Sequence, residues 1–175
     1  MNYFQELKRS MEWLSQQNNT IFVGQGVEVK GTGISNSLVD IPIEKRLELP
    51  VMEDFQAGLC NGLALAGKVP ICVYPRWNFA LLAVNQIVNH LDKIPIYSDY
   101  RPKVIIRVGV GSVNPLHPQA QHVGDYSIAF KAMMSTIEVI RLEDSFEIFP
   151  AYKRAYERSD GRSTLLVEFP DSYNK

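Results

Sequence analysis

The sequence lacks the features of several large protein classes. It has 2 cysteines in 175 residues, and 18 Lys and Arg nearly balance 19 Asp and Glu. The longest apolar run is FALLAV (79–84), far below the roughly 20 residues that span a bilayer, and the N-terminus has no apolar signal core. The balanced charge argues against a nucleic-acid face. We therefore expect one domain over residues 1–175 in a reducing, cytoplasmic setting, without nucleic acid or membrane as a partner.

Three familiar ligand-binding signatures are also missing. The chain has no GxxxxGKS/T phosphate loop, no GxGxxG after the first predicted strand and no GxSxG elbow. A nucleotide-binding Rossmann protein is therefore disfavoured. Cys60 and Cys72 lie inside apolar runs, without Cys or His at metal-ligand spacing. We expect two free, buried thiols and no metal site.

Strand-like and helix-like patterns alternate along the chain. Strands are predicted at TIFVGQ (20–25), RLEL (46–49), VPICVYP (69–75), KVIIRVGVG (103–111), IEVIRL (137–142) and TLLVEF (164–169). Helices are predicted near the N-terminus, from residue 53 onward, and at 79–94, 125–134 and 145–159. This order predicts a three-layer α/β/α fold around a doubly wound, mainly parallel sheet.

Three of the predicted helices carry specific expectations about burial or shape. The helix that starts near residue 53 is expected to bury the stripe Met52, Phe55, Leu59, Leu63 and Ala66, with Ala57, Gly58, Gly62 and Ala64 keeping its remaining surface narrow. The next helix is expected to bury Leu81, Val84, Ile87, Val88 and Leu91. Pro150 is expected to kink or divide the last helix, because proline removes a backbone donor.

Ligands of such folds bind beyond the carboxyl ends of the strands. That rule selects four loops, at residues 24–37, 50–54, 75–79 and 109–124. Glu53 lies in the second loop, where an acid is often a first-turn residue favoured by the helix dipole. Its apolar neighbours Val51, Met52 and Phe55 allow a second interpretation, in which a partly desolvated carboxyl shares a proton with a ligand nitrogen.

Aromatic and imidazole side chains fall in two of the other loops. Trp77 and Phe79 stand at a strand-to-helix junction, where rings usually fill the core but can also stack on a flat heterocycle. His117 and His122 lie in the loop segment NPLHPQAQH. A loop histidine is more often solvated than catalytic, yet its titration near neutrality suits proton transfer. The residues alone indicate an α/β ligand-binding domain.

The segments that carry these residues resemble one known family. The stretch PVMEDFQAGLCNGLALAGKVPICVYPRWNFALLAVNQIVNHLDK and the later AQH are similar to the pyrimidine-binding domain of thiamine-diphosphate enzymes. The similarity is greatest to the beta subunit of the 2-oxoacid dehydrogenase E1 component and to the central domain of transketolase, and it runs over nearly the whole chain. It implies the thiamine-diphosphate-binding fold for residues 1–175, with no C-terminal transketolase-type domain.

The resemblance also implies roles for individual residues. Glu53 matches the catalytic glutamate that hydrogen-bonds N1′ of the aminopyrimidine of thiamine diphosphate, so that the cofactor's own N4′ can deprotonate its thiazolium ring. Phe79 matches the aromatic residue that packs on the pyrimidine, and Trp77 is predicted to contact the cofactor as well. His122 matches the catalytic histidine that lies near the reacting substrate.

The chain departs from the usual family pattern at a few positions. Gln25 replaces an acidic pair, Phe55 replaces a glycine, and Val123 and Gly124 replace Ser and Gln. The GDG…N motif that holds the diphosphate and its magnesium in this family is absent. The resemblance therefore implies that magnesium sits on a separate diphosphate-binding, E1 alpha-like subunit. We expect a homodimer of this chain within a heterotetramer that contains that subunit.

These implications lead to one hypothesis and two alternatives. The leading hypothesis is an oxidoreductase subunit of the E1 beta type that decarboxylates a 2-oxo acid. A transketolase-like transferase of ketol or acyloin groups is the first alternative, because the C-terminal domain is missing. A non-catalytic α/β assembly module is the second, because of the departures from the family pattern.

Overall fold

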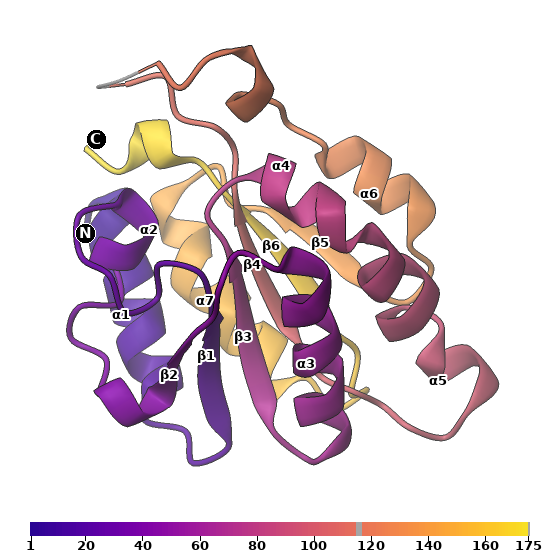
Figure 1. Ribbon diagram of the computed structural model, residues 1–175. Coiled ribbons are helices and arrows are strands. Elements are labelled where there is room, and N and C mark those ends of the chain that lie inside the picture. The colour runs from indigo at the N-terminus through magenta and orange to yellow at the C-terminus, as the bar shows by residue number, and fades with distance from the viewer. Residues whose placement is uncertain (115–116, 175) are drawn as a thin grey trace.

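The computed structural model describes residues 1–114 and 117–174, which form a six-stranded sheet in the order β2-β1-β3-β4-β6-β5 (Figure 1). Every neighbouring pair is parallel. The strands are β1 (Thr20–Gly24), β2 (Arg46–Glu48), β3 (Val69–Tyr74), β4 (Ile105–Gly109), β5 (Glu138–Arg141) and β6 (Thr164–Glu168). All six predicted strands are present. The strand order reverses between β1 and β3, and such a switch point is where open parallel sheets bind ligands.

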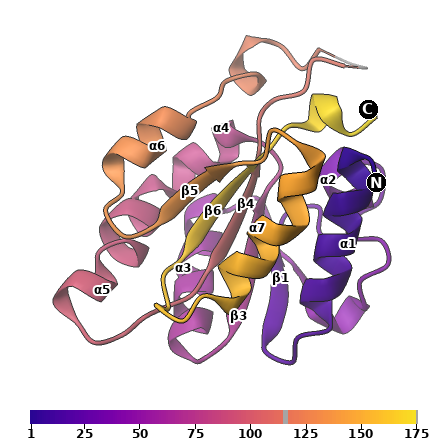
Figure 2. The same ribbon diagram turned by 180° about the vertical axis from the view of Figure 1, so that it is seen from behind.

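Helices cover both faces of the sheet, as predicted for a three-layer α/β/α fold (Figures 1 and 2). One face is covered by α1 (Tyr3–Ser15) and α7 (Ser145–Glu157). The other is covered by α3 (Glu53–Leu65), α4 (Trp77–Ala80), the π-helix η3 (Asn85–Leu91) and α6 (Ser127–Met133). Successive residues of β3 alternate between these two cores, and all six are buried. A strand buried on both faces explains the unbroken apolar run VPICVY.

The first helix, α1, is present near the N-terminus, as predicted. Asn2 caps it, because its side chain accepts from the backbone N–H of Gln5 while the Gln5 side chain accepts from the Asn2 N–H. Leu7, Met11 and Leu14 are fully buried against the sheet and α7. The helix ends at Ser15, just before β1.

The segment predicted as one helix over 79–94 is broken into several pieces. After α4 come the 3-10 turn η2 (Leu81–Ala83), the π-helix η3 and the short α5 (Ile94–Tyr97). Ile87 and Leu91 are buried as predicted, but Leu81 is 39% exposed. The prediction for Leu81 is wrong because a 3.6-residue period does not persist through 3-10 and π turns.

The remaining short elements lie in the connections. They are α2 (Gly33–Asn36), η1 (Ile43–Lys45), η4 (Ala120–His122) and η5 (Pro170–Ser172). Among the described residues, no helix is long and apolar enough to cross a membrane.

Pro150 does not divide the last helix, so the predicted division is wrong, while the predicted kink stays a prediction. The helix α7 runs without interruption from Ser145 to Glu157 with Pro150 inside it. Proline leaves the carbonyl four residues earlier without its helical donor. That residue is Phe146, which is 73% exposed and lies in the first turn of the helix.

The buried side of α3 is also not the predicted one. The structure buries Glu53, Gln56, Ala57, Cys60, Asn61 and Ala64, which follow a regular helical period. The bulkier Phe55 is 50% exposed. The small Ala57, Cys60 and Ala64 let the helix approach β3 closely. Gln56 donates to the carbonyl of Val73 in β3, and Asn61 donates to the carbonyl of Gln86 in η3. The large apolar side chains consequently face outward.

Candidate functional site

Glu53 is a buried acid at the carboxyl edge of the sheet. It is the first residue of α3, and its side chain belongs to the inward face of the helix, with 5% of the residue exposed. Within the part of the chain that the structure describes, its carboxylate has no hydrogen bond and no ion pair. The carboxylate oxygens are not among the buried polar atoms that lack a partner, so they reach the surface at the sheet edge. A carboxylate at this edge without an internal partner is a candidate for ligand contacts.

The reason for its burial differs from the predicted one. Val51, Met52 and Phe55 were expected to form the apolar wall of Glu53, but they are 74%, 53% and 50% exposed. This expectation is wrong because the start of α3 turns those three side chains outward. The fully buried Gln56 and the nearly buried Ala57 lie on the helix face that carries Glu53.

Hydrogen bonds attach the first turn of α3 to the end of β3. The Tyr74 hydroxyl donates to the backbone carbonyl of Glu53 over 3.1 Å. Gln56 Nε2 donates to the carbonyl of Val73 over 2.9 Å. Burial raises the pKa of Tyr74, and the neighbouring Cys72 and Glu53 raise it further, so the hydroxyl remains a donor. Glu53 is therefore held by its backbone, while its carboxylate is left available.

Phe79 and His122 meet at the same edge of the sheet, from different loops. Phe79 lies in α4 after β3, and His122 ends η4 in the loop after β4. Their rings are 6.1 Å apart between centroids and inclined by 38°. Both residues are half-buried. The structure thus brings two of the predicted site residues into contact, from positions 43 residues apart in the sequence.

The close approach of two loop segments positions His122. A Cβ atom added to Gly111 would lie 1.6 Å from the carbonyl oxygen of His122, so only glycine permits this packing. His122 Nε2 lies 3.0 Å from the side-chain amide nitrogen of Gln121, and an amide nitrogen can only donate. Nε2 then accepts, and the buried Nδ1 carries a proton without a partner among the described residues. The sequence analysis did not identify Gly111 as a site residue.

Trp77 and His117 lie apart from this pair. The Trp77 ring is 1% exposed and packs on Phe130 with 4.7 Å between ring centroids, so it fills the core behind α4. His117 is exposed, and its Nδ1 accepts from the backbone N–H of Gln119. The structure therefore gives both residues local structural contacts.

Buried polar atoms without partners gather near the strand ends. The structure shows seven such side-chain atoms among the described residues, and five belong to segments that follow β1, β2, β3 or β4: Gln25 Nε2, Gln56 Oε1, Trp77 Nε1, Asn78 Oδ1 and His122 Nδ1. Native proteins leave few buried polar atoms unsatisfied. Trp77 Nε1 lies in the core, but the other four atoms follow strand ends at one edge, where a ligand would supply the missing partners. Gln56 was not predicted as a site residue, although it lies one helical turn after Glu53.

Metal ligands do not gather anywhere in the described residues. No group of three or more His, Cys, Asp or Glu side chains there could hold a metal ion. Cys60 and Cys72 are free and buried, as predicted. The Cys60 pKa is raised, first by its hydrogen bond with Cys72 and then by burial, so it remains a protonated thiol.

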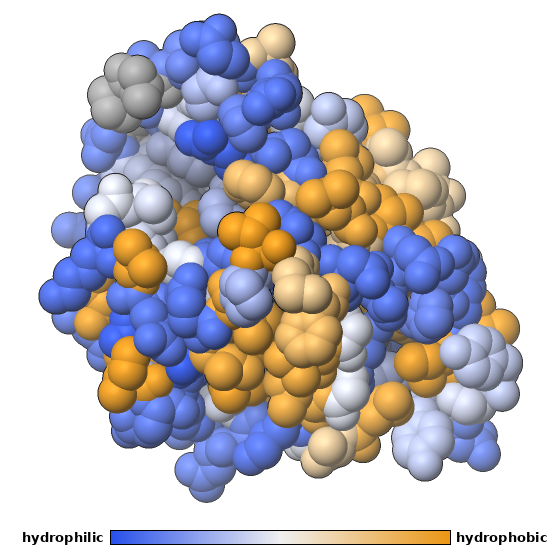
Figure 3. Space-filling view, in the orientation of Figure 1, coloured by the Kyte–Doolittle hydropathy of each residue, from blue (hydrophilic) through white to orange (hydrophobic). Residues whose placement is uncertain are grey.

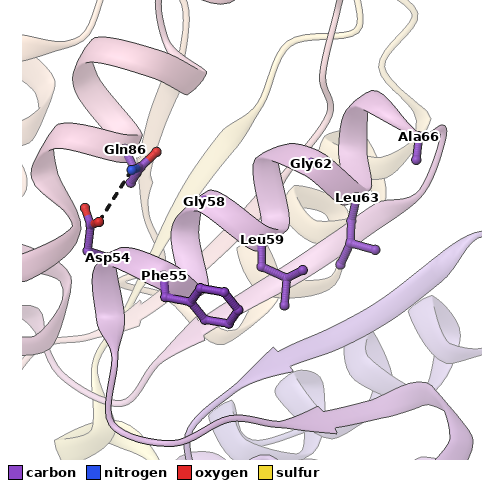
Figure 4. Close-up of a pocket in the computed structure, with 8 residues that line it drawn as sticks. All are labelled: Asp54, Phe55, Gly58, Leu59, Gly62, Leu63, Ala66 and Gln86. Carbon is purple, nitrogen blue, oxygen red and sulfur yellow. Dashed lines mark hydrogen bonds between the residues drawn. The ribbon is translucent and has the colours of Figure 1, made fainter.

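The outward side of α3 forms an apolar groove of about 560 Å³. Hydrophobic residues gather over α3 on the molecular surface (Figure 3). Phe55, Leu59 and Leu63 project on one side of the helix (Figure 4). Gly58 and Gly62 leave the helix backbone uncovered between these side chains and Gln86, which donates to Asp54. A helix surface of this kind suits close packing of another apolar element.

Curated relatives match parts of the chain. The mitochondrial pyruvate dehydrogenase E1 component subunit beta of Chaetomium thermophilum is 41% identical over 61 residues, which is 34% of this chain and 16% of that protein. The Caenorhabditis elegans protein of the same name is 34% identical over 85 residues, or 48% of this chain and 24% of that protein. The chain thus matches less than a quarter of the length of either relative. No family model matches the sequence.

Solved structures match the whole fold at low sequence identity. A split-gene transketolase, described as an inactive beta4 tetramer, has a TM-score of 0.74 and 16% identity over 97% of this chain and 52% of that chain. The transketolase of Campylobacter jejuni has a TM-score of 0.76 and 15% identity over 97% of this chain and 26% of that chain. Together, the partial sequence matches and the shared fold confirm the resemblance to a pyrimidine-binding domain of the E1 beta and transketolase type.

Proposed function

We propose that this chain is the pyrimidine-binding half of a thiamine-diphosphate enzyme that acts on a 2-oxo acid. The observation that carries the proposal is Glu53, a nearly buried residue at the start of a helix on the ligand-binding edge of a parallel sheet, whose carboxylate has no partner among the described residues. The partial similarity to E1 beta subunits, whose name includes pyruvate dehydrogenase, supports the 2-oxo acid.

The residues of the site have properties that suit this cofactor. Glu53 would hydrogen-bond the ring nitrogen N1′ of the aminopyrimidine, and its burial strengthens that bond. Phe79 would pack on the flat ring, while the unpartnered Nδ1 of His122 would face charge that develops on the substrate. When bound, thiamine diphosphate supplies the carbanion chemistry next to a carbonyl. We assign Trp77 to packing behind Phe79, since its ring is in the core.

The diphosphate and its magnesium would be bound by a second, E1 alpha-like subunit. The chain has no GDG…N motif, and the described residues contain no metal-ligand cluster. We propose that this subunit covers the apolar groove of α3, which is next to Glu53 in sequence and leaves Phe55 half exposed. Two copies of each chain would form a heterotetramer. A cytoplasmic location stays a prediction, whereas the pyruvate dehydrogenase relatives are named as mitochondrial proteins.

A transketolase-like transfer of ketol groups is the second candidate reaction. The fold similarity to two transketolases favours it. A non-catalytic module is the third, because the Gln25, Phe55, Val123 and Gly124 positions differ from the family pattern. The same experiment separates all three.

The test is turnover in a reconstituted complex. The chain is co-expressed with the product of a neighbouring gene that carries GDG…N, and thiamine diphosphate and magnesium are added. We expect decarboxylation of simple 2-oxo acids, lost in Glu53→Gln. Ketol transfer between sugars without decarboxylation would support the second candidate. A complex that forms, yet shows no turnover and no stabilisation by the cofactor, would identify a non-catalytic module.

A further inference from the structure

The two cysteines of the chain lie against each other in the core where α3 packs on β3 (Figure 1). Cys60 is on the inward side of α3 and Cys72 is in β3, and they are 0% and 1% exposed. Both belong to the same hydrophobic cluster, and a hydrogen bond joins the two thiols. The chain has no other cysteine. The proposed function uses neither sulfur atom.

The neighbouring Gln56 shows independently how Cys72 lies relative to the helix. Gln56 Nε2 donates to Cys72 Sγ over 3.4 Å. Gln56 and Cys60 are one helical turn apart on the same buried side of α3, so their side chains are neighbours. The small Ala57 and Ala64 on either side of Cys60 keep the helix close to the strand. Cys72 therefore faces the part of α3 that carries Cys60.

The two thiols differ in how readily they ionise. Burial raises the pKa of Cys72, but hydrogen bonds from Cys60, Gln56 and Tyr74 outweigh it and lower the pKa below its ordinary value. The pKa of Cys60 is raised, by its hydrogen bond with Cys72 and by burial. The thiolate is the form of cysteine that attacks an oxidant. Cys72 is therefore the nucleophile of the pair, and Cys60 is the second thiol that can resolve the product.

We infer that Cys60 and Cys72 are a reversible oxidation site, at which a hydroperoxide forms a disulfide that fastens α3 to β3. The Cys72 thiolate attacks one oxygen of hydrogen peroxide, the O–O bond breaks, and the leaving hydroxide takes up the proton that the thiol lost, which gives a sulfenic acid and water. The Cys60 sulfur then attacks the Cys72 sulfur. The S–S bond forms, the S–O bond breaks, and the hydroxide leaves as water with the Cys60 proton. The two sulfur atoms supply the two electrons that reduce the peroxide.

The disulfide would join two elements of the candidate site. Glu53 is the first residue of α3, and Phe79 lies in the segment that follows β3. Hydrogen peroxide is small and uncharged, and local opening of the core admits it to the buried pair. In a reducing compartment the thiols stay reduced and are oxidised only transiently. The reaction requires this chain alone, so it is independent of the proposed function.

Oxidation of the purified, reduced chain tests the inference. Hydrogen peroxide is added in small molar excess, and intact mass, thiol content and a tryptic peptide map are measured. We expect the chain to lose two hydrogen atoms and both thiols, with a link between the tryptic peptides 47–68 and 69–76. Dithiothreitol should reverse all three changes. The oxidised chain should unfold about 5–10 °C higher than the reduced chain, because the link restricts the unfolded chain.

Variants at the two positions separate their roles. Cys60→Ala leaves Cys72 without a resolving thiol, so a sulfenic acid should accumulate at Cys72 and be trapped by dimedone. Cys72→Ala removes the nucleophile, and Cys60 should then resist the same treatment. Circular dichroism checks that each variant is folded. The peptide map of the wild-type chain decides the matter even if a variant does not fold.

Several results would overturn the inference. They are two thiols that survive treatment of the folded chain, separate sulfinic acids at Cys60 and Cys72 without a link, and a disulfide between two copies of the chain. A link that forms only after the chain has been unfolded in urea, or that lowers the unfolding temperature, would show that the folded core does not accommodate the bond.

Discussion

Three buried carboxylates of this protein have very different surroundings. Glu168, at the end of β6, accepts from Arg107, Tyr152 and Tyr173. Asp92, after the π-helix, accepts from the backbone N–H groups of Ser135, Thr136 and Ile137. Glu53 is 5% exposed, whereas Glu168 and Asp92 are fully buried, and its carboxylate has no partner among the described residues. Acids that support the fold are satisfied within it, while the acid at the ligand edge is not.

This difference indicates which of the three acids can be replaced without a loss of stability. Burial alone would lower the pKa of Arg107, but the adjacent Glu168 carboxylate outweighs it and raises the pKa, so this pair stays charged in the core. Removing one member of such a pair is costly. Removing the charge of Glu53 leaves no internal partner behind. Substitutions at Glu168 and Asp92 should therefore lower the free energy of unfolding, whereas a substitution at Glu53 should lower activity without lowering stability.

The largest expected effect is on activity, from Glu53→Gln in the reconstituted complex. Turnover should fall by about 100-fold or more, because the amide cannot exchange a proton with the ring nitrogen. The free energy of unfolding should change little, since the carboxylate has no partner within the described residues to lose. Steady-state kinetics and urea unfolding measure the two quantities. A destabilised Glu53→Gln chain would mean that Glu53 belongs with the structural acids.

Glu168→Gln should have the largest effect on stability. It leaves the Arg107 guanidinium buried without its counter-charge, so we expect a loss of about 3–5 kcal/mol in the free energy of unfolding. The control is Glu143→Gln, which removes the 61% exposed carboxylate partner of Arg141 and should cost less than about 1 kcal/mol. Urea unfolding of both variants provides the comparison, and similar losses would refute the contrast between buried and exposed pairs.

Asp92 gives stability that depends on pH. Burial would raise its pKa, but hydrogen bonds from Lys93 and from the backbone of Ser135, Ile137 and Thr136 lower it to about 2. Because the folded pKa lies below the unfolded value of about 3.9, the stabilisation is complete above pH 4 and is lost as the pH falls towards 2. Asp92→Asn should cost about 2 kcal/mol at pH 7.

Unfolding measured from pH 7 to pH 2 tests this prediction. The wild-type chain should lose its advantage over Asp92→Asn between about pH 4 and pH 2. A constant difference across that range would show that geometry, not the charge of Asp92, holds the 135–137 segment.

The smallest expected effect is at Gly62, on the open side of α3. A Cβ atom added there meets nothing within 4 Å, so Gly62→Ala should stabilise the free chain by about 0.5–1 kcal/mol. If the partner subunit packs on this groove, the same methyl group should weaken assembly. The control is Gly67→Ala, which should destabilise the chain because Gly67 has φ of 85°.

Unfolding of the free chain and ultracentrifugation of the complex measure the two effects of Gly62→Ala. A variant that is more stable and assembles as well as the wild type would place the partner elsewhere.

Strand positions were predictable because buried parallel strands are apolar throughout. The strand VPICVY can be recognised from its own sequence alone, because both of its faces are covered and every position is therefore apolar. The orientation of α3 was not predictable from apolar spacing alone. Its inward side uses Ala57, Cys60 and Ala64 to approach β3, and its bulkier side is left outward. Hydrophobic periodicity marks a buried face but does not say whether this chain or a partner buries it.

The candidate site was predicted in part, and for partly wrong reasons. Glu53 is buried as the functional interpretation required, but the expected wall of Val51, Met52 and Phe55 is exposed. The contact between Phe79 and His122 follows from the parallel sheet, which brings successive loops to one edge. Gly111 and Gln56 could not be identified, because their importance depends on the contacts of His122 and Val73 in space.

Calorimetric titration of thiamine diphosphate with magnesium into the two-subunit complex tests the role of Glu53 most directly. The wild-type complex should bind the cofactor at least tenfold more tightly than Glu53→Gln, because a hydrogen bond to a buried charged group contributes about 1.5–3 kcal/mol. Equal affinity of the two complexes for the cofactor would contradict the account, because the carboxylate of Glu53 would then not be the group that binds the aminopyrimidine ring.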